Sequence, residues 1–214
     1  MIKAIVFDFD GVILDNADVK TDAFVELYAH HGPDVTAKVR AHHLANLGIS
    51  RFKKFEWIAH NVLRTSITDD ESKALGRQFS DLALAKVLAS PFVGGAQSAL
   101  AVLAAQLPLM VASGTPQDEL DLIVDKRDLR GYFKEVHGSP KEKPAIIKDI
   151  LARYALAPRE VLFVGDGASD HKAAVATGVE FLARDTPAVH DEWVKLGVRR
   201  EPDLARLPEV VATW

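Results

Sequence analysis

The chain has 214 residues, of which 48% are hydrophobic and 26% charged, as in an ordinary globular protein with one sizeable core. Its formal net charge of -4 gives no reason to expect a nucleic acid or an anionic membrane as partner. The absence of cysteine excludes disulfides, zinc sites built on thiolates and a cysteine nucleophile.

The first predicted element is a strand over residues 2–7, IKAIVF, which is apolar on both faces. Such continuous apolar runs are typical of central strands in a parallel sheet that helices cover on both sides. Asp8 interrupts this run before it is long enough for a signal peptide, and no later segment could span a bilayer. We therefore expect a cytoplasmic protein.

Helices follow where the crossover to a second strand is expected. Amphipathic patterns occupy residues 18–32, 35–48, 50–63 and a long segment after Thr68. Thr68 and Glu71 have the spacing of a capping box, which marks the start of that last helix. A parallel crossover needs only about a dozen residues. The excess predicts a helical cap domain over residues 17–88, inserted into a core domain of residues 1–16 and 89–214.

From residue 91 onward, predicted strands and helices alternate. The strands are expected at residues 107–113, 133–138, 161–166 and 179–183, and the helices at 94–106, 116–126, 143–155 and 169–178. Thr115 and Pro116 have the residue types of an N-cap and a first-turn proline. This alternation predicts an α/β fold whose core is a doubly wound, Rossmann-like parallel sheet.

Polar residues follow four of the predicted strands at their carboxyl ends, where open α/β sheets bind ligands. In chain order these residues are Asp8 and Asp10, then Ser113-Gly114-Thr115, then Lys143, then Asp166 with Asp170 one helical turn later. A single aspartate after a strand is often only a turn former or a helix cap. Four such signals in chain order are much harder to obtain by chance, so we expect one active site.

The residue types predict phosphoryl chemistry. A pocket of carboxylate oxygens without thiolates favours Mg²⁺, and its candidate ligands are Asp8, Asp10, Asp166 and Asp170. Asp8 can also be the nucleophile, because carboxylates form aspartyl-phosphate intermediates. Asp10 can serve as general acid for the leaving group and then as base for water. Lys143 would offset negative charge and orient the phosphate and the nucleophile.

A phosphate dianion also needs hydrogen-bond donors at this edge of the sheet. The candidates are the backbone N–H groups of Gly11, Val12 and Gly114 and the hydroxyl group of Ser113. Charge balance supports the division of roles. Asp8, Asp166 and Asp170 carry about -3, while Mg²⁺ and Lys143 carry about +3, so the site is near neutral before substrate arrives.

The motifs DFDGVILDN, ASGTP, KEKP and VGDGASD resemble, in order, the four motifs of the haloacid dehalogenase-like superfamily. The helical insertion is similar to the cap of its β-phosphoglucomutase-like branch. The resemblance implies a Mg²⁺-dependent enzyme that transfers phosphoryl groups through an aspartyl-phosphate. The third motif departs from the usual glycine-lysine-proline run and offers two lysines, Lys141 and Lys143. Lys143 is preferred because proline follows it directly.

In that branch, a loop between cap helices lies over the active site, and Gly48, Ser50 and Arg51 match its pattern. Ser50 and Arg51 are therefore the predicted specificity residues, with His43 and Lys54 as lesser candidates. Residues 48–57 also alternate basic and aromatic side chains, which would suit a nucleic-acid surface, but the net charge disfavours it. An amphipathic helix with solvated lysines explains the same pattern.

The sequence thus predicts a phosphatase that acts on a small phosphorylated metabolite, such as a sugar phosphate or a phosphorylated acid, as a monomer or dimer. Asp10 argues against the resembling dehalogenases and phosphonate hydrolases, which usually lack it. A sugar phosphomutase would use the same residues and stays open as the alternative. A non-catalytic protein that binds a phosphate ligand is the alternative from another class, and the intact acidic set disfavours it.

Overall fold

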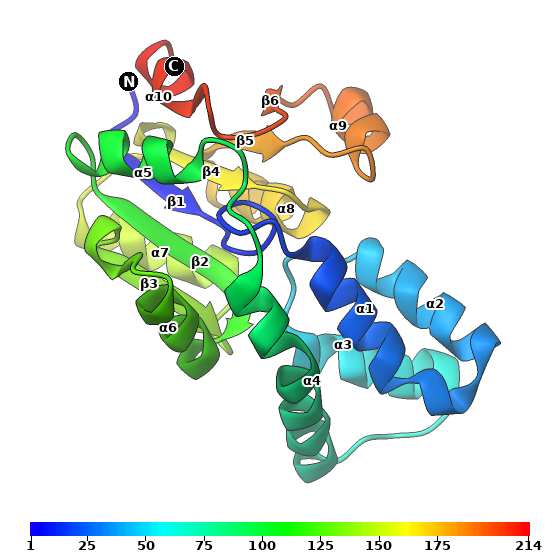
Figure 1. Cartoon of the computed structure of the whole chain (residues 1–214). Helices are drawn as coiled ribbons and strands as arrows, with labels where there is room; N and C mark the ends of the chain where they lie inside the picture. Colours follow the sequence, from blue (N-terminus) through cyan, green and yellow to red (C-terminus); the bar gives the residue numbers. More distant parts are fainter.

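The computed structural model describes residues 1–214 and contains a six-stranded sheet (Figure 1). The strands are β1 (Ala4–Phe7), β2 (Leu109–Pro116), β3 (Glu135–Ser139), β4 (Val161–Gly165), β5 (Glu180–Arg184) and β6 (Arg200–Glu201). Their order is β3-β2-β1-β4-β5-β6, and every neighbouring pair is parallel. From β1 the sheet is extended first through β2 to β3 and then, on the other side of β1, from β4 to β6. This arrangement confirms the doubly wound α/β fold, and the change of direction creates a crevice beyond the ends of β1 and β4.

Helices cover both faces of this sheet. They are α5 (Ala96–Ala104), α6 (Gln117–Lys126), α7 (Lys143–Arg153), α8 (Ala168–Thr177), α9 (His190–Leu196) and α10 (Leu207–Ala212). Ile5 and Phe7 of β1 belong to the core cluster that includes α5, α6 and α10, whereas Ala4 and Val6 belong to the cluster that includes α7 and α8. Alternate residues of β1 thus face opposite layers, as the continuous apolar run predicts.

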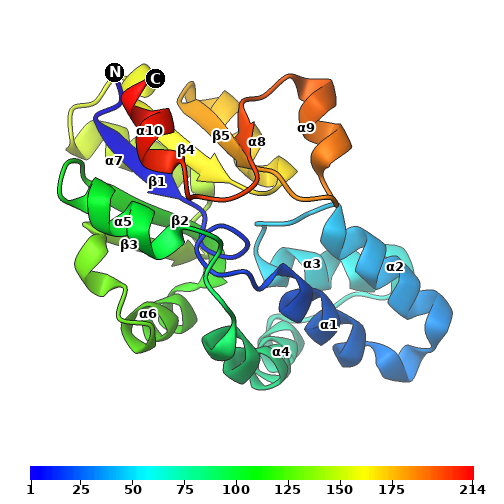
Figure 2. The same cartoon turned by 45° about the horizontal axis from the view of Figure 1, so that its top comes forward.

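Four further helices lie between β1 and β2 in the chain and form a group beside the sheet (Figures 1 and 2). They are α1 (Ala17–Leu27), α2 (Pro33–Leu44), α3 (Arg51–Ile58) and α4 (Asp69–Ala89). Phe24 of α1 packs on Phe55 of α3 and Phe79 of α4, with ring centroids 5.8 and 4.6 Å apart. The helices are therefore packed around an aromatic cluster, which is continuous with the apolar core on one face of the sheet.

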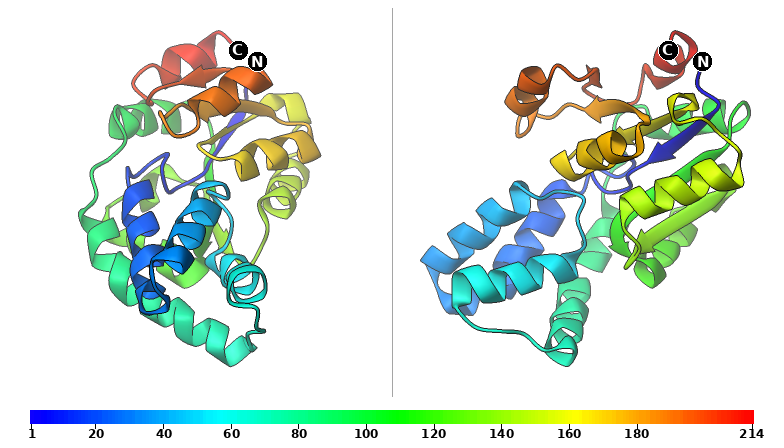
Figure 3. Two further views of the ribbon diagram at one scale, coloured as in Figure 1. Left: turned by 90° about the vertical axis from the view of Figure 1, so that its right-hand side faces the viewer. Right: turned by 180° about the vertical axis from the view of Figure 1, so that it is seen from behind.

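Two linkers join the helical group to the sheet, and they run side by side. Leu14 pairs with Phe92 in an antiparallel bridge. The N–H of Asp15 donates to the carbonyl of Pro91 at 2.9 Å, and the N–H of Val93 donates to that of Ile13 at 3.0 Å. The view from behind shows the helical group beside the sheet-bearing part, joined to it by these connections (right panel of Figure 3).

Several details can be compared with the sequence predictions. The capping box of Thr68 and Glu71 is confirmed. The helix α6 begins one residue later than expected, so its N-cap is Pro116 and the expected cap at Thr115 is wrong. The short elements β6, α9 and α10 were not predicted, and the third insertion helix ends at Ile58 before a π-helical turn, Ala59–Leu63. No helix combines the length and the apolar character that crossing a bilayer requires.

Candidate active site

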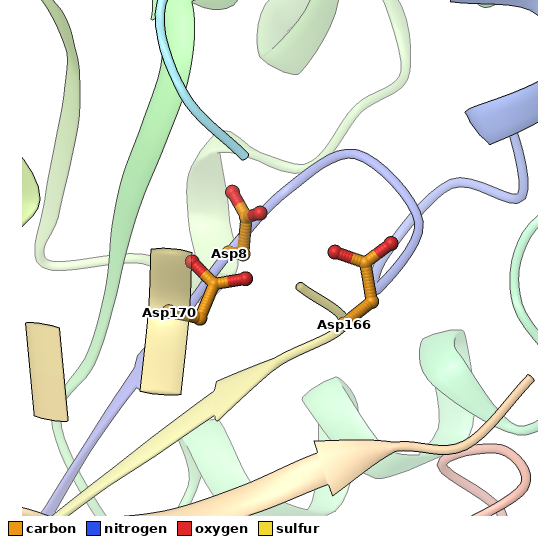
Figure 4. A group of neighbouring side chains, drawn as sticks. All are labelled: Asp8, Asp166 and Asp170. Carbon is orange, nitrogen blue, oxygen red and sulfur yellow. The ribbon is translucent and has the colours of Figure 1, made fainter. Parts of the chain in front are cut away.

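Three carboxylates meet at the carboxyl end of the sheet (Figure 4). Asp8 follows β1, Asp166 follows β4, and Asp170 lies in the first turn of α8. One oxygen of each lies within 4.8 Å of the others, and all three side chains are buried. Asp166 Oδ1 is buried without a hydrogen-bond partner, and Asp8 Oδ2 is buried in an ion pair with Lys143. Buried carboxylate oxygens that lack partners are available to a cation.

The electrostatics of this cluster suit a divalent ion. Burial raises the pKa of Asp8 well above its usual range, and Asp170 and Asp166 add to the effect that Lys143 opposes. Burial, followed by the charge of Asp170, raises the pKa of Asp166 to about 7. A bound cation would stabilise the ionised forms of Asp8 and Asp166, and hard carboxylate oxygens are the ligands that Mg²⁺ prefers. Asp8, Asp166 and Asp170 therefore fit a Mg²⁺ site.

Lys143 reaches this cluster from the first turn of α7. Its Nζ lies 2.9 Å from Asp8 Oδ2 and donates a hydrogen bond to Asp170 Oδ1. Burial lowers the pKa of Lys143, but the charges of Asp170 and Asp8 outweigh burial and raise it above its usual value. Lys141 instead pairs with Asp149 at the surface. Of the two lysines of the third motif, the structure brings only Lys143 to the carboxylates.

The carboxylate of Asp10 does not join the other three. It accepts hydrogen bonds from Thr115 Oγ1 and Asn16 Nδ2, both at 2.6 Å, and forms an ion pair with Lys20. Burial raises the pKa of Asp10, but Lys20 and the two hydrogen bonds outweigh it, so its pKa is lowered. The carboxylate is therefore held apart from the other three, and the role of Asp10 as a metal ligand stays a prediction. Asn16 and Lys20 were not predicted as partners of Asp10. Their spacing of four residues at the start of a helix places them on one face of it, and this was a usable signal.

The turn after β1 changes the predicted phosphate contacts. The N–H of Gly11 donates to Leu14 O at 2.8 Å and to Asn16 Oδ1 at 3.1 Å, while that of Val12 donates to Phe9 O at 3.4 Å. These N–H groups hold the turn in this structure, and their role as phosphate donors stays a prediction. The hydroxyl of Ser113 accepts from the N–H of Thr115 at 3.1 Å, which leaves its own proton free to donate.

The loop between α2 and α3 lies directly over these residues. Ser169 Oγ donates to the carbonyl of Leu47 at 2.6 Å. Gly48 has a φ of +77°, and a Cβ there would lie 2.6 Å from Ser169 Oγ and 2.8 Å from Lys143 Nζ. A Cβ on Gly114 would similarly lie 2.6 Å from the carbonyl of Gly48. Only glycine allows this close approach of the loop to the site. Ser169 was not predicted.

Of the predicted specificity residues, Arg51 is buried and already paired. Its guanidinium donates to both carboxylate oxygens of Glu119, at 2.9 and 2.6 Å, and to Ser80 Oγ at 2.7 Å. It also lies 4.4 Å above the ring of Phe79. Glu119 therefore neutralises the charge of Arg51. Ser50 precedes α3 and lines a separate cavity with Ser113, Lys143 and Ser169.

A small cavity lies between the insertion and the carboxyl end of the sheet. Its volume is about 50 Å³. The residues that give it its charge are Asp8, Asp10, Asp166, Lys20, Arg51 and Lys54. His43 and the rings of Phe24 and Phe79 complete part of its wall. The adjoining cavity that Ser50 lines has a volume of about 140 Å³. The arrangement suits a compact polar ligand that spans the carboxylate cluster and the insertion.

The chain is similar to known proteins both in sequence and in fold. A family model described as haloacid dehalogenase-like hydrolase matches residues 2–178. Among curated proteins, the chain is similar to the phosphoglycolate phosphatase of Photorhabdus laumondii, with 29% identity over 185 residues, 83% of this chain and 77% of that protein. It is also similar to the phosphoglycolate phosphatase of Yersinia pseudotuberculosis, with 26% identity over 189 residues, covering 83% and 78% of the two chains.

Two solved structures illustrate the likeness of the fold. A predicted phosphoglycolate phosphatase from Haemophilus somnus has a TM-score of 0.72 and 21% identity, covering 98% of each chain. CbbY from Rhodobacter sphaeroides, solved in complex with phosphate, has a TM-score of 0.75 and 18% identity, covering 97% of this chain and 96% of that chain. The likeness extends over the sheet and the inserted helices together.

Proposed function

The chain belongs to the haloacid dehalogenase-like hydrolase family and is an enzyme of its phosphatase kind, and we propose that it hydrolyses a small phosphorylated metabolite. The proposed reaction depends on Mg²⁺ and passes through an aspartyl-phosphate, the acyl phosphate of the Asp8 carboxylate. The observation that supports it most is the buried group of Asp8, Asp166 and Asp170, to which Lys143 is paired. The names of the curated relatives are in keeping with a phosphorylated small acid as substrate.

In the first proposed step, an oxygen of Asp8 attacks the phosphorus atom as the bond to the leaving oxygen breaks. Asp8, Asp166 and Asp170 would hold Mg²⁺, which would offset the negative charge of phosphate and nucleophile. Lys143 lies close enough to Asp8 to orient its nucleophilic oxygen and, together with Mg²⁺, would favour its ionised form. The Ser113 hydroxyl and the backbone of Gly114 are the proposed phosphate donors on the other side.

Asp10 is the proposed proton donor and acceptor. It lines the cavity where the leaving group would lie and is held there by Lys20, Thr115 and Asn16. In the first step Asp10 would pass to the leaving oxygen the proton that a phosphate monoester monoanion brings in, because Lys20 keeps the carboxylate itself ionised in the free enzyme. In the second step it takes a proton from the water that attacks the phosphorus atom and releases Asp8 and inorganic phosphate. The three partners set the orientation of its carboxylate for both steps.

The helical insertion is the proposed cap, which excludes water from the reaction when it is closed. Ser50 and Arg51 remain proposed contacts of the leaving group. Only three of the five N–H groups of Arg51 are used by Glu119 and Ser80, so two remain for a ligand. The contacts of Leu47 with Ser169 and of Gly48 with Gly114 support a closed position over the site.

Turnover of p-nitrophenyl phosphate and acetyl phosphate, with and without Mg²⁺, tests the proposal. We expect Mg²⁺-dependent release of phosphate. A pure protein that is inert with Mg²⁺ on a broad panel of phosphate esters would instead indicate a non-catalytic phosphate-binding protein. Conversion of a hexose 1-phosphate to its 6-phosphate without release of phosphate would indicate a sugar phosphomutase.

A further inference from the structure

We infer, on the basis of the proposed function, that Lys54 selects substrates whose leaving group carries a carboxylate. Lys54 is on α3, its side chain is only 3% exposed, and it lines the cavity that Asp8 and Asp10 line. Its ammonium group forms no ion pair, and its hydrogen bond is to His43 Nδ1, at 3.0 Å. A buried ammonium in a ligand cavity needs a counter-charge, and the ligand can provide it.

The other cations around this cavity already have counter-charges. Lys20 is paired with Asp10, and Arg51 is paired through two hydrogen bonds with Glu119. Lys143, which lies beyond the cavity at the carboxylate cluster, is paired with Asp8 and Asp170. Lys54 is thus the one cation of the cavity wall that forms no ion pair with a carboxylate of the protein, and a negatively charged group of the ligand would provide that partner.

His43 holds Lys54 in place as a neutral acceptor. Burial, with the nearby charges of Lys54 and Lys20, lowers the pKa of His43 to about 2, so the ring stays neutral. An ammonium group can only donate, so Nδ1 accepts and the ring proton is on Nε2. That Nε2 is buried without a partner. A ligand carboxylate could therefore meet a charged donor, Lys54, and a neutral donor, His43, on the same wall.

The size of the cavity limits the chemistry further. A volume of about 50 Å³ suits a leaving group of two or three carbons rather than a sugar. The rings of Phe24 and Phe79 lie along the wall and would contact the short carbon chain. Small phosphorylated hydroxy acids therefore match the charge, the donors and the volume together. A second phosphate offers the same kind of charge but is larger, and the experiment separates the two.

The test compares three substrates on the Mg²⁺-loaded enzyme: phosphoglycolate, its neutral amide, and the bisphosphate of ethylene glycol. For Lys54→Met we expect kcat/KM to fall about 10- to 100-fold on phosphoglycolate, mostly through KM, and to change little on the amide. The matched control is Lys73→Met, at an exposed lysine of α4 paired only with Asp70. It is expected to behave as wild type on all three substrates.

His43 is tested by two substitutions. His43→Leu removes the acceptor of Lys54 and is expected to raise KM for phosphoglycolate, whereas His43→Asn keeps a polar group near Nδ1 and is expected to restore part of the loss. A merely structural role of His43 would change KM for phosphoglycolate and for its amide alike. Competitive inhibition of the wild-type enzyme by glycolate and glycolamide gives a measurement without any substitution. We expect glycolate to inhibit at a concentration at least about tenfold lower.

The outcomes distinguish this inference from the function on which it rests. Equal losses on the acid and the amide in Lys54→Met, or equal inhibition by glycolate and glycolamide, would overturn the role of Lys54 while leaving the phosphatase intact. A wild-type preference for the bisphosphate would overturn the carboxylate in favour of a second phosphate. An enzyme inert on acetyl phosphate as well would overturn the phosphatase function itself.

Discussion

Arg51 on α3 and Glu119 on α6 form a bidentate ion pair between the helical insertion and the sheet-bearing part of the chain. Their side chains are only 5% and 10% exposed, and Ser80 of α4 hydrogen-bonds to both. The three groups form a small, largely buried polar network between α3, α4 and α6. The pair therefore holds the insertion against α6, and with it the loop that lies over the carboxylate cluster.

Glu119→Gln is expected to open the insertion rather than unfold the protein. The substitution leaves the guanidinium of Arg51 without its counter-charge, and opening lets that group reach water. We expect faster amide hydrogen exchange in residues 47–50. KM on the best substrate should rise about tenfold, which corresponds to roughly 1.4 kcal/mol of lost closure free energy.

A second ion pair between the insertion and the sheet-bearing part provides the control. Lys53 pairs with Glu142, but both side chains are more than half exposed, so this pair contributes little. Glu142→Gln should leave hydrogen exchange in the loop and KM close to wild type. Equal effects of Glu119→Gln and Glu142→Gln would contradict a special role for the buried pair.

Asp8→Asn is expected to abolish turnover, because an amide cannot form the acyl phosphate. Asp10→Asn should lower kcat by about 10²- to 10⁴-fold, since the proton transfers would lose their donor and acceptor. Phosphate release from p-nitrophenyl phosphate with Mg²⁺ measures both. Beryllofluoride should bind to the wild type and to Asp10→Asn but not to Asp8→Asn. Appreciable turnover by Asp8→Asn would rule out the covalent route.

Mg²⁺ is expected to raise the Tm of the wild-type protein and to be required for turnover. Binding to the folded state alone stabilises it by about 2.7 kcal/mol at a free concentration of 100 times Kd. Asp166→Asn should lose the Mg²⁺-dependent rise in Tm, because its carboxylate is one of the three candidate ligands. Asp22→Asn, at an exposed carboxylate of α1, should keep it. The same rise in both variants would exclude Asp166 from the metal site.

The burial of Lys54 is also expected to make the free energy of unfolding of the protein depend on pH. Burial, reinforced by the charges of Lys20 and Lys143 and opposed by those of Asp166 and Asp10, lowers the pKa of Lys54 from 10.5 to about 7. The unfolded chain therefore binds more protons at this group between pH 7 and 10.5, so its contribution to the free energy of unfolding rises with pH. His43, its hydrogen-bonding neighbour, stays neutral over this range.

Below pH 7 the cost of the buried charge is fully present, and Lys54→Met should be the more stable protein there. Its advantage over wild type should shrink as the pH rises from 7 towards 10. Urea unfolding of both proteins at several pH values measures this difference. A variant that is less stable than wild type by the same amount at every pH would contradict the buried, unpaired charge.

The sequence contained enough to predict the sheet, the helical insertion and the convergence of Asp8, Asp166 and Asp170, because strand patterns and strand-end polarity are local signals. It did not reveal which partners the side chains would choose. Arg51 and Glu119 are 68 residues apart, and their pairing depends on how the insertion sits on α6. The turn that uses the N–H groups of Gly11 and Val12 depends likewise on Asn16, whose amide closes it.

The side-by-side linkers at Leu14 and Phe92 have a consequence for how this architecture can vary. The chain leaves the sheet and returns to it at the same place, so the insertion is joined to the strands only through these two paired linkers. This connection is the same whatever length of chain lies beyond it. Helices could be added, removed or exchanged beyond these linkers without altering the strand order or the carboxylate cluster. A chimaera that carries a foreign helical unit on these linkers should thus keep its phosphate chemistry and acquire the substrate preference of the donor.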